Sequence, residues 1–177
     1  MSQLRITNYK IHDGIVDVDG NVNISYKRYK TFPVQFGIVT GHFWCNGNKL
    51  SSLQGAPREV GGSFWCDDNK LTSLKGAPRE VGGVFWCSNN KLTSLQGAPI
   101  EVGGSFICRT NNLTSLHGAP REVGGDFWCH FNNLTSLEGA PKEVVGSFRC
   151  DNNNQLTSLR GAPIVYGDFY CYCNLKI

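Results

Sequence analysis

Residues 61–81, GGSFWCDDNKLTSLKGAPREV, contain a pattern that returns with small changes along most of the chain. Phe recurs every 21 residues, at positions 43, 64, 85, 106, 127, 148 and 169, and a Cys follows two residues later each time. A fixed period of this length indicates a solenoid, in which each repeat forms one coil and covers the apolar face of the next.

Each repeat reads Phe-x-Cys-x-x-Asn-x-Leu-(Ser/Thr)-Ser-Leu-x-Gly-Ala-Pro. This spacing resembles the leucine-rich repeat, with Phe and Cys in place of the first two leucines. In such a coil Phe-x-Cys is a strand of a parallel sheet on the concave face, and the rest of the repeat returns along the back as extended chain. Phe and Cys both point inward, and Leu71 and Leu74 with their counterparts close the core. We therefore predict a β-rich, leucine-rich-repeat-like solenoid with little or no helix.

The same period predicts how the single domain, 1–177, is organised. Subtracting 21 from Phe43 and Cys45 leads to Val22 and Ile24, so a degenerate repeat precedes the regular ones. Before it, YKIHDGIVDVDG (residues 9–20) alternates apolar and polar residues around Asp13-Gly14, which predicts a hairpin that caps the core. The predicted parts are an N-terminal cap (1–21), a degenerate repeat (22–42), six repeats (43–168) and a terminal strand (169–177).

Three recurrent features are interpreted as scaffold. The Asn three residues after each Cys can satisfy backbone groups at a sharp bend, and the Gly-Ala-Pro and Gly-Gly segments supply turns and close backbone approach. The Cys column is expected to fill the core as small apolar side chains, because the sequence contains no Cys-x-x-Cys. Cys173 stands outside the series, and we predict no metal site there or elsewhere.

Composition excludes several function classes. The net charge of +3 is too small to indicate nucleic acid or an anionic membrane by itself. No stretch approaches the ~18 apolar residues of a membrane span, and the N-terminus lacks a signal-peptide core, so we expect a cytoplasmic protein. The four histidines are scattered and no catalytic or phosphate-binding motif occurs, which predicts a protein that is not an enzyme and has no cofactor.

The candidate binding residues lie between Phe and Cys, where strand alternation turns the side chain outward. This column contains Trp44, Trp65, Trp86, Ile107, Trp128, Arg149 and Tyr170, and the neighbouring outward positions include Arg109, Asp126, His130 and Tyr172. One interpretation is that the tryptophans stack only on each other and stabilise the ladder. The other, which we favour, is an aromatic surface for a partner, because exposed rings would exceed the apolar patch of a typical monomer.

Two further features of this face leave alternatives open. Arg109, His130 and Arg149 lie among aromatic residues, a mixture suited to an acidic peptide or a nucleotide, unless the arginines are paired with Asp126 and Asp151. The C-terminal stretch FYCYCNLKI shows no cap, so its strand edge is available to a second copy in a homodimer, or is a short frayed end.

Residues 15–177 resemble a group of proteins encoded by tailed bacteriophages, in which LTSLxGAPxxVGG and aromatic-x-Cys are repeated after an opening like VDVDGNVNIS. The resemblance implies a solenoid made in the cytoplasm of an infected bacterium and carries no specific activity. Phages use small accessory proteins to counteract host defence, which gives two hypotheses for this chain: a protein that blocks a host protein with its aromatic face, or a sponge that sequesters a small anionic signalling nucleotide. Single-stranded nucleic acid is a weaker third option because few cations point outward.

Overall fold

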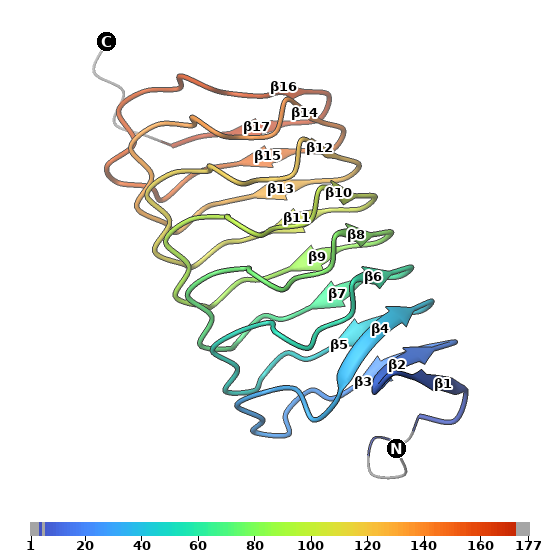
Figure 1. Cartoon of the computed structure of the whole chain (residues 1–177). Coiled ribbons are helices and arrows are strands. Elements are labelled where there is room, and N and C mark those ends of the chain that lie inside the picture. Colours follow the sequence, from blue (N-terminus) through green and yellow to red (C-terminus); the bar gives the residue numbers. More distant parts are fainter. Residues whose placement is uncertain (1–3, 5, 173–177) are drawn as a thin grey trace.

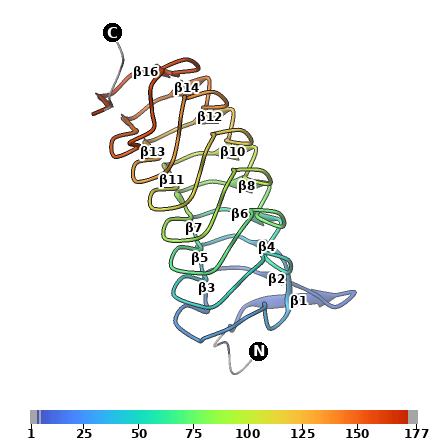
Figure 2. The same cartoon turned by 90° about the vertical axis from the view of Figure 1, so that its left-hand side faces the viewer.

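The computed structural model describes residue 4 and residues 6–172. It is a β-solenoid whose coils lie directly on one another along one axis, and all the elements of this part of the chain are strands (Figures 1 and 2). The predicted repeat coil with a parallel sheet of Phe-x-Cys strands is therefore confirmed, and these segments pair in register from coil to coil. Successive coils thus place equivalent side chains in straight columns along the stack.

One sheet, here called sheet B, contains the Phe-x-Cys strands and carries the candidate site on its outer side. Its strand order is β17-β15-β13-β11-β9-β7-β5-β3, and every pairing is parallel. Its strands are β3 (Val22–Asn23), β5 (Phe43–Trp44), β7 (Phe64–Trp65), β9 (Phe85–Trp86), β11 (Phe106–Ile107), β13 (Phe127–Trp128), β15 (Phe148–Arg149) and β17 (Phe169–Tyr170).

The return path of each coil, which we expected to be extended chain, forms a second sheet, sheet A. Its order is β1-β2-β4-β6-β8-β10-β12-β14-β16. Its strands are β1 (Tyr9–His12), β2 (Ile15–Val18), β4 (Gln35–Val39), β6 (Glu59–Val60), β8 (Glu80–Val81), β10 (Glu101–Val102), β12 (Glu122–Val123), β14 (Glu143–Val144) and β16 (Ile164–Val165). Most of these strands have two residues, too few for alternation to reveal them in the sequence.

The core lies between the two sheets and consists of the predicted columns. Phe43, Cys45, Leu50 and Leu53 and their counterparts as far as Cys150 have no exposed surface. The Phe rings stack face to face from coil to coil, with centroids 5.2–5.5 Å apart between Phe43 and Phe148. Such stacks and the burial of whole columns explain why Phe and Cys never leave their positions.

The Asn column forms the predicted ladder at the bend after sheet B. In one coil, the Asn111 side chain donates to the carbonyl oxygens of Cys87 and Cys108, both at 3.1 Å, and accepts the Leu92 N–H at 3.1 Å. The pattern repeats at Asn69, Asn90, Asn132 and Asn153. Each amide therefore joins two adjacent coils and satisfies backbone groups that have no strand partner there.

The N-terminal cap is a hairpin, as predicted. Strands β1 and β2 pair antiparallel, and the turn residues Asp13 and Gly14 have φ values of 50° and 75°. Strand β2 then pairs in parallel with β4, so the hairpin continues sheet A. In the degenerate repeat, Val22 and Ile24 are buried as the period predicts.

The C-terminal end keeps register despite the extra residue, Asn154, in its repeat. Phe169 pairs with Phe148 and Ile164 with Glu143, so the shorter segment after Pro163 compensates for the insertion. Strands β16 and β17 are the last strands of their sheets in the described part of the chain. The terminal strand was predicted over 169–177; the structure has β17 at Phe169–Tyr170, and Cys173 lies outside the described residues.

Candidate functional site

The tryptophan column lies on the outer side of sheet B, because the Phe and Cys on either side of each Trp point into the core. Trp44, Trp65 and Trp86 occupy consecutive coils and contact each other edge to face. Their centroid separations are 6.2 Å between Trp44 and Trp65 and 5.5 Å between Trp65 and Trp86. The ring-to-ring contacts of the ladder interpretation are therefore present between Trp44 and Trp65 and between Trp65 and Trp86.

The same rings are less exposed than our sequence argument assumed. Trp44, Trp65, Trp86 and Trp128 are all half-buried, and Ile107, between Trp86 and Trp128 in the ladder, is only 7% exposed. The expectation of an accessible Ile107 is thus wrong, since the two larger rings flank a short aliphatic side chain. What remains accessible is one part of each indole.

Two of the indoles also have an unsatisfied polar edge. The Nε1 atoms of Trp65 and Trp86 are buried and have no hydrogen-bond partner among the described residues, and neither does Oδ1 of Asp67. Burial raises the pKa of Asp67 to about 6, and Arg109 acts weakly in the opposite direction. Unpaired buried donors and acceptors are costly, so these three atoms destabilise the folded chain on its own.

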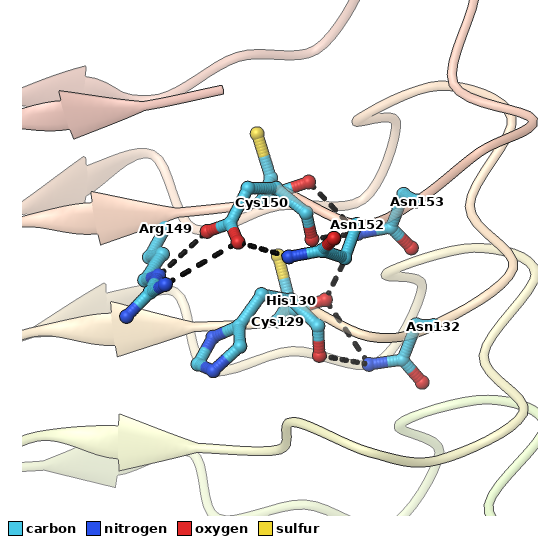
Figure 3. Close-up of polar contacts among 8 residues, drawn as sticks. Cys129, His130, Asn132, Arg149, Cys150, Asn152 and Asn153 are labelled. Atoms are coloured by element: carbon cyan, nitrogen blue, oxygen red, sulfur yellow. Dashed lines mark hydrogen bonds and ion pairs between the residues drawn. The ribbon is translucent and has the colours of Figure 1, made fainter. Parts of the chain in front are cut away.

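A second cluster lies further along the face, on β13 and β15 (Figure 3). The guanidinium of Arg149 donates to the Asp151 carboxylate at 2.6 Å from Nε and 3.3 Å from Nη2. Asp151 is 3% exposed; burial pushes its pKa upward, but the bonds from Arg149 prevail and hold the pKa below its ordinary value. The predicted alternative of an Arg149–Asp151 ion pair is therefore correct.

His130 lies beside this ion pair and is 4% exposed (Figure 3). Its Nδ1 atom has no partner in the described structure. Burial, and then the positive charge of Arg149, lower its pKa to about 4. At neutral pH the imidazole is uncharged, so His130 does not supply the cation that we had expected from it.

Asp126 belongs to a structural ladder at the start of the sheet B strands. Its Oδ1 accepts the backbone N–H of Ser147 at 2.8 Å, and Ser105 and Ser147 accept N–H groups of the next coil in the same way. No ion pair joins Asp126 to Arg109 within the described residues. The other predicted alternative for the arginines is therefore wrong for Arg109.

The predicted aromatic residues of the last coil are the most exposed members of the site. Tyr170 and Tyr172 are 43% and 83% exposed, and the Tyr170 hydroxyl donates to Asp168 at 2.8 Å. Phe131, which we did not predict, is 50% exposed and packs its ring 5.3 Å from His130. The positive φ of Phe131, 54°, places it in a turn column whose residue type varies, so the repeat gave no signal for it.

Sheet A carries a groove of about 860 Å³ on its outer side, which the sequence did not suggest. Its lining includes Gly61, Gly82, Gly103 and Gly124 and the in-register residues Glu59, Glu80, Glu101, Glu122 and Glu143. Arg58, Arg79 and Arg121 pair with the Glu that follows each of them, at 3.2–4.0 Å. The side chains of all three pairs are exposed to solvent.

The cysteine column is part of the core from Cys45 to Cys150, as predicted. These cysteines are buried, and burial raises the pKa of the Cys66, Cys87 and Cys129 thiols well above the ordinary value. In residues 4 and 6–172, no three His, Cys, Asp or Glu side chains are grouped so that they could hold a metal ion. None of the described segments is a helix long and apolar enough to cross a membrane.

No family model matches the chain, and no curated protein or solved structure matches it either.

Proposed function

We propose that this chain is a non-enzymatic binding protein that holds a protein partner on the outer side of sheet B, with the tryptophan column at the centre of the contact. The observation that carries the proposal is the pair of half-buried indoles of Trp65 and Trp86, whose N–H groups donate to nothing in the described structure. If the indole rings turn to expose their N–H groups, a partner carbonyl or carboxylate that accepts from them removes a cost of about 1–3 kcal/mol per group. Trp is also the residue type that most often dominates binding energy.

The resemblance to phage proteins supplies the class of partner. A chain made in the cytoplasm of an infected bacterium meets host proteins, and a blocked component of host defence is the partner that this proposal names. The solenoid fits the role because its sheet is rigid: its columns are fixed by buried Phe stacks and Asn ladders, so little order has to be gained on binding.

Sequestration of a small anionic nucleotide is the less favoured function. It needs Arg109, His130 and Arg149 as cations, yet Arg149 is bonded to Asp151 and the pKa of His130 is about 4. A phosphate at this cluster would compete with a buried carboxylate. Native mass spectrometry of the purified chain tests this choice: release of a nucleotide on denaturation would overturn the protein-partner proposal.

The partner proposal itself is tested with the triple variant Trp65→Ser, Trp86→Ser, Trp128→Ser in pull-downs from lysate of the host bacterium. We expect the wild-type chain to retain one defined protein and the triple variant to lose it. Ile100→Ser, at an exposed apolar residue just before strand β10 of sheet A, is the matched control and retains the partner. Circular dichroism confirms that each variant is folded, and a folded triple variant that retains the partner overturns the proposal.

Because three Ser substitutions remove much packing, a second variant separates the N–H groups from the ring area. Trp65→Phe with Trp86→Phe keeps aromatic contact in the column but removes both donors. We expect weaker binding by about tenfold for two lost hydrogen bonds, measured by calorimetry with the captured protein. Undiminished affinity would show that the indole N–H groups do not contribute.

A further inference from the structure

A row of cations follows the Asn ladder at the edge of sheet B. In four consecutive coils, the residue directly after the bend is a cation with an exposed side chain: Arg28, Lys49, Lys70 and Lys91. Backbone bonds keep these coils in register: Lys49 N–H donates to Tyr29 O, Lys70 N–H to Leu50 O and Lys91 N–H to Leu71 O, at 2.8–2.9 Å. Neighbouring members of this row, here called the basic row, are therefore about one strand spacing, ~4.8 Å, apart.

The basic row is not neutralised by the rest of the described chain. None of its members forms an ion pair there, whereas Arg58, Arg79 and Arg121 on the other side of the coil each pair with a Glu. Like charges at neighbouring positions of a ladder destabilise it. Because no ion pair of the described chain offsets this repulsion, the basic row points to a role in binding another molecule.

The lysines of the basic row and the tryptophan contacts occupy the same three coils. The three coils that carry Lys49, Lys70 and Lys91 are those that carry Trp44, Trp65 and Trp86, five residues earlier in each repeat. In the next two coils the same position is Asn112 and Asn133. One continuous partner surface can thus meet the aromatic column and the basic row together on the N-terminal half of the stack.

We propose that the basic row binds an acidic segment of the partner, an extended run rich in Asp and Glu, beside the tryptophan column. This inference rests on the proposed function and adds the charge of the partner to it. Alternate side chains of an extended segment lie ~6.6 Å apart, and the flexible Lys stems can span the difference from the ~4.8 Å spacing of the row. Complementary charge of this kind directs encounter and register more than it adds affinity.

A protein segment fits better than single-stranded nucleic acid. Nucleic acid needs open ring faces for its bases, but Trp44, Trp65 and Trp86 pack edge to face on each other and are half-buried. The small net charge of +3 points the same way, because phosphate binding by multiple contacts normally comes with a strongly basic surface.

The test uses a fluorescein-labelled deca-glutamate peptide as probe and follows anisotropy in 50 mM and 300 mM salt. The row variant is Lys49→Gln, Lys70→Gln, Lys91→Gln, and the matched control, Lys10→Gln, Lys75→Gln, Lys142→Gln, removes the same charge from other exposed sites. We expect binding that weakens with salt, a loss of about tenfold in the row variant and a loss of less than about twofold in the control.

Three outcomes overturn the inference: equal losses in the two variants, a row variant that binds like wild type, or tighter binding of a labelled fifteen-nucleotide thymidine strand than of the peptide. The Trp65→Ser, Trp86→Ser, Trp128→Ser variant keeps the two proposals apart. If it loses the host partner while the row variant keeps full affinity, the charge inference fails and the proposed function stands. If it keeps the partner, the proposed function fails whatever the row does.

Discussion

The guanidinium of Arg149 and the carboxylate of Asp151 form an ion pair in which one member is exposed and the other buried. Nε lies 2.6 Å from Oδ1, the Arg149 side chain is 43% exposed and that of Asp151 is 4% exposed. The pair spans two outward positions of a single strand end, so it fixes the surface of the face at β15 (Figure 3). The main consequence is that the Arg149 guanidinium neutralises the buried Asp151 carboxylate and is not a free cation for a ligand.

Replacing Arg149 by Ala should therefore lower the free energy of unfolding by about 2–3 kcal/mol at pH 7, because Asp151 is left as an unpaired buried charge. Chemical denaturation measures this loss. Asp151→Asn should restore most of it in the Arg149→Ala background. Arg160→Ala, which breaks the exposed Arg160–Glu138 pair of 2.9 Å, is the control and should cost less than about 1 kcal/mol. Equal losses for the two Arg variants would contradict the assignment.

The Asn ladder provides a test of scaffold against surface with two adjacent asparagines. Asn111→Ala removes the amide that satisfies Cys87, Cys108 and Leu92, and we expect a loss of about 2–4 kcal/mol in unfolding free energy. Asn112→Ala changes an exposed side chain of the same type and should cost less than about 0.5 kcal/mol. Urea unfolding followed by Trp fluorescence compares the two. A ladder role is wrong if the Asn112 variant is the less stable one.

Asp67 should make the protein less stable as pH rises. Its pKa is about 6 in the folded chain, above the ordinary value, so the folded state binds the proton more tightly and loses that advantage between about pH 4 and 6. Asp67→Asn should thus raise the unfolding free energy at pH 8 by about 1 kcal/mol and should change it little at pH 4. The expected gain at pH 8 is small because the side chain is only half-buried and solvent screens its charge. Asp126→Asn, which keeps an acceptor oxygen for Ser147, is the control in thermal scans at both pH values.

His130 should have the opposite pH dependence. Its pKa is about 4 in the folded chain against 6.5 ordinarily, so the unfolded state takes up the proton first and stability falls as pH drops from 6.5 towards 4. NMR of the imidazole protons should show no titration of His130 between pH 5 and 7.5. A His130→Gln variant should lose less stability than wild type over the acid range, and His117→Gln controls for removal of an exposed imidazole. A midpoint for His130 near pH 6.5 would refute this assignment.

The buried cysteine column predicts a simple chemical result. Six thiols, from Cys45 to Cys150, lie in the core, whereas Cys171 is half-buried. A thiol-specific disulfide reagent should therefore modify at most two of the eight cysteines in the folded protein and all eight after denaturation, since it reacts with exposed thiolates. Rapid modification of four or more in the folded chain would show that the column is not a packed core.

Much of the scaffold could be predicted because the same arrangement of apolar and turn residues recurs with a fixed period of 21 residues. The Phe, Cys, Asn and Leu columns, the hairpin at Asp13-Gly14 and the register after Asn154 all follow from spacing alone. Sheet A could not be predicted, because a two-residue Glu-Val strand has no pattern of its own and exists only through its neighbours. The candidate site was predicted as a set of outward positions, without their burial or partners.

The sequence by itself determined the coil, its period and the direction of each side chain, because alternation along a strand and stacking of identical repeats leave no other way to bury Phe43 and its counterparts. Only the tertiary structure decided what the outward residues do. Ring contacts half-bury the tryptophans and cover Ile107, Asp151 occupies Arg149, and burial keeps His130 uncharged. These properties depend on distances between neighbouring coils and on solvent access, which residue spacing does not contain.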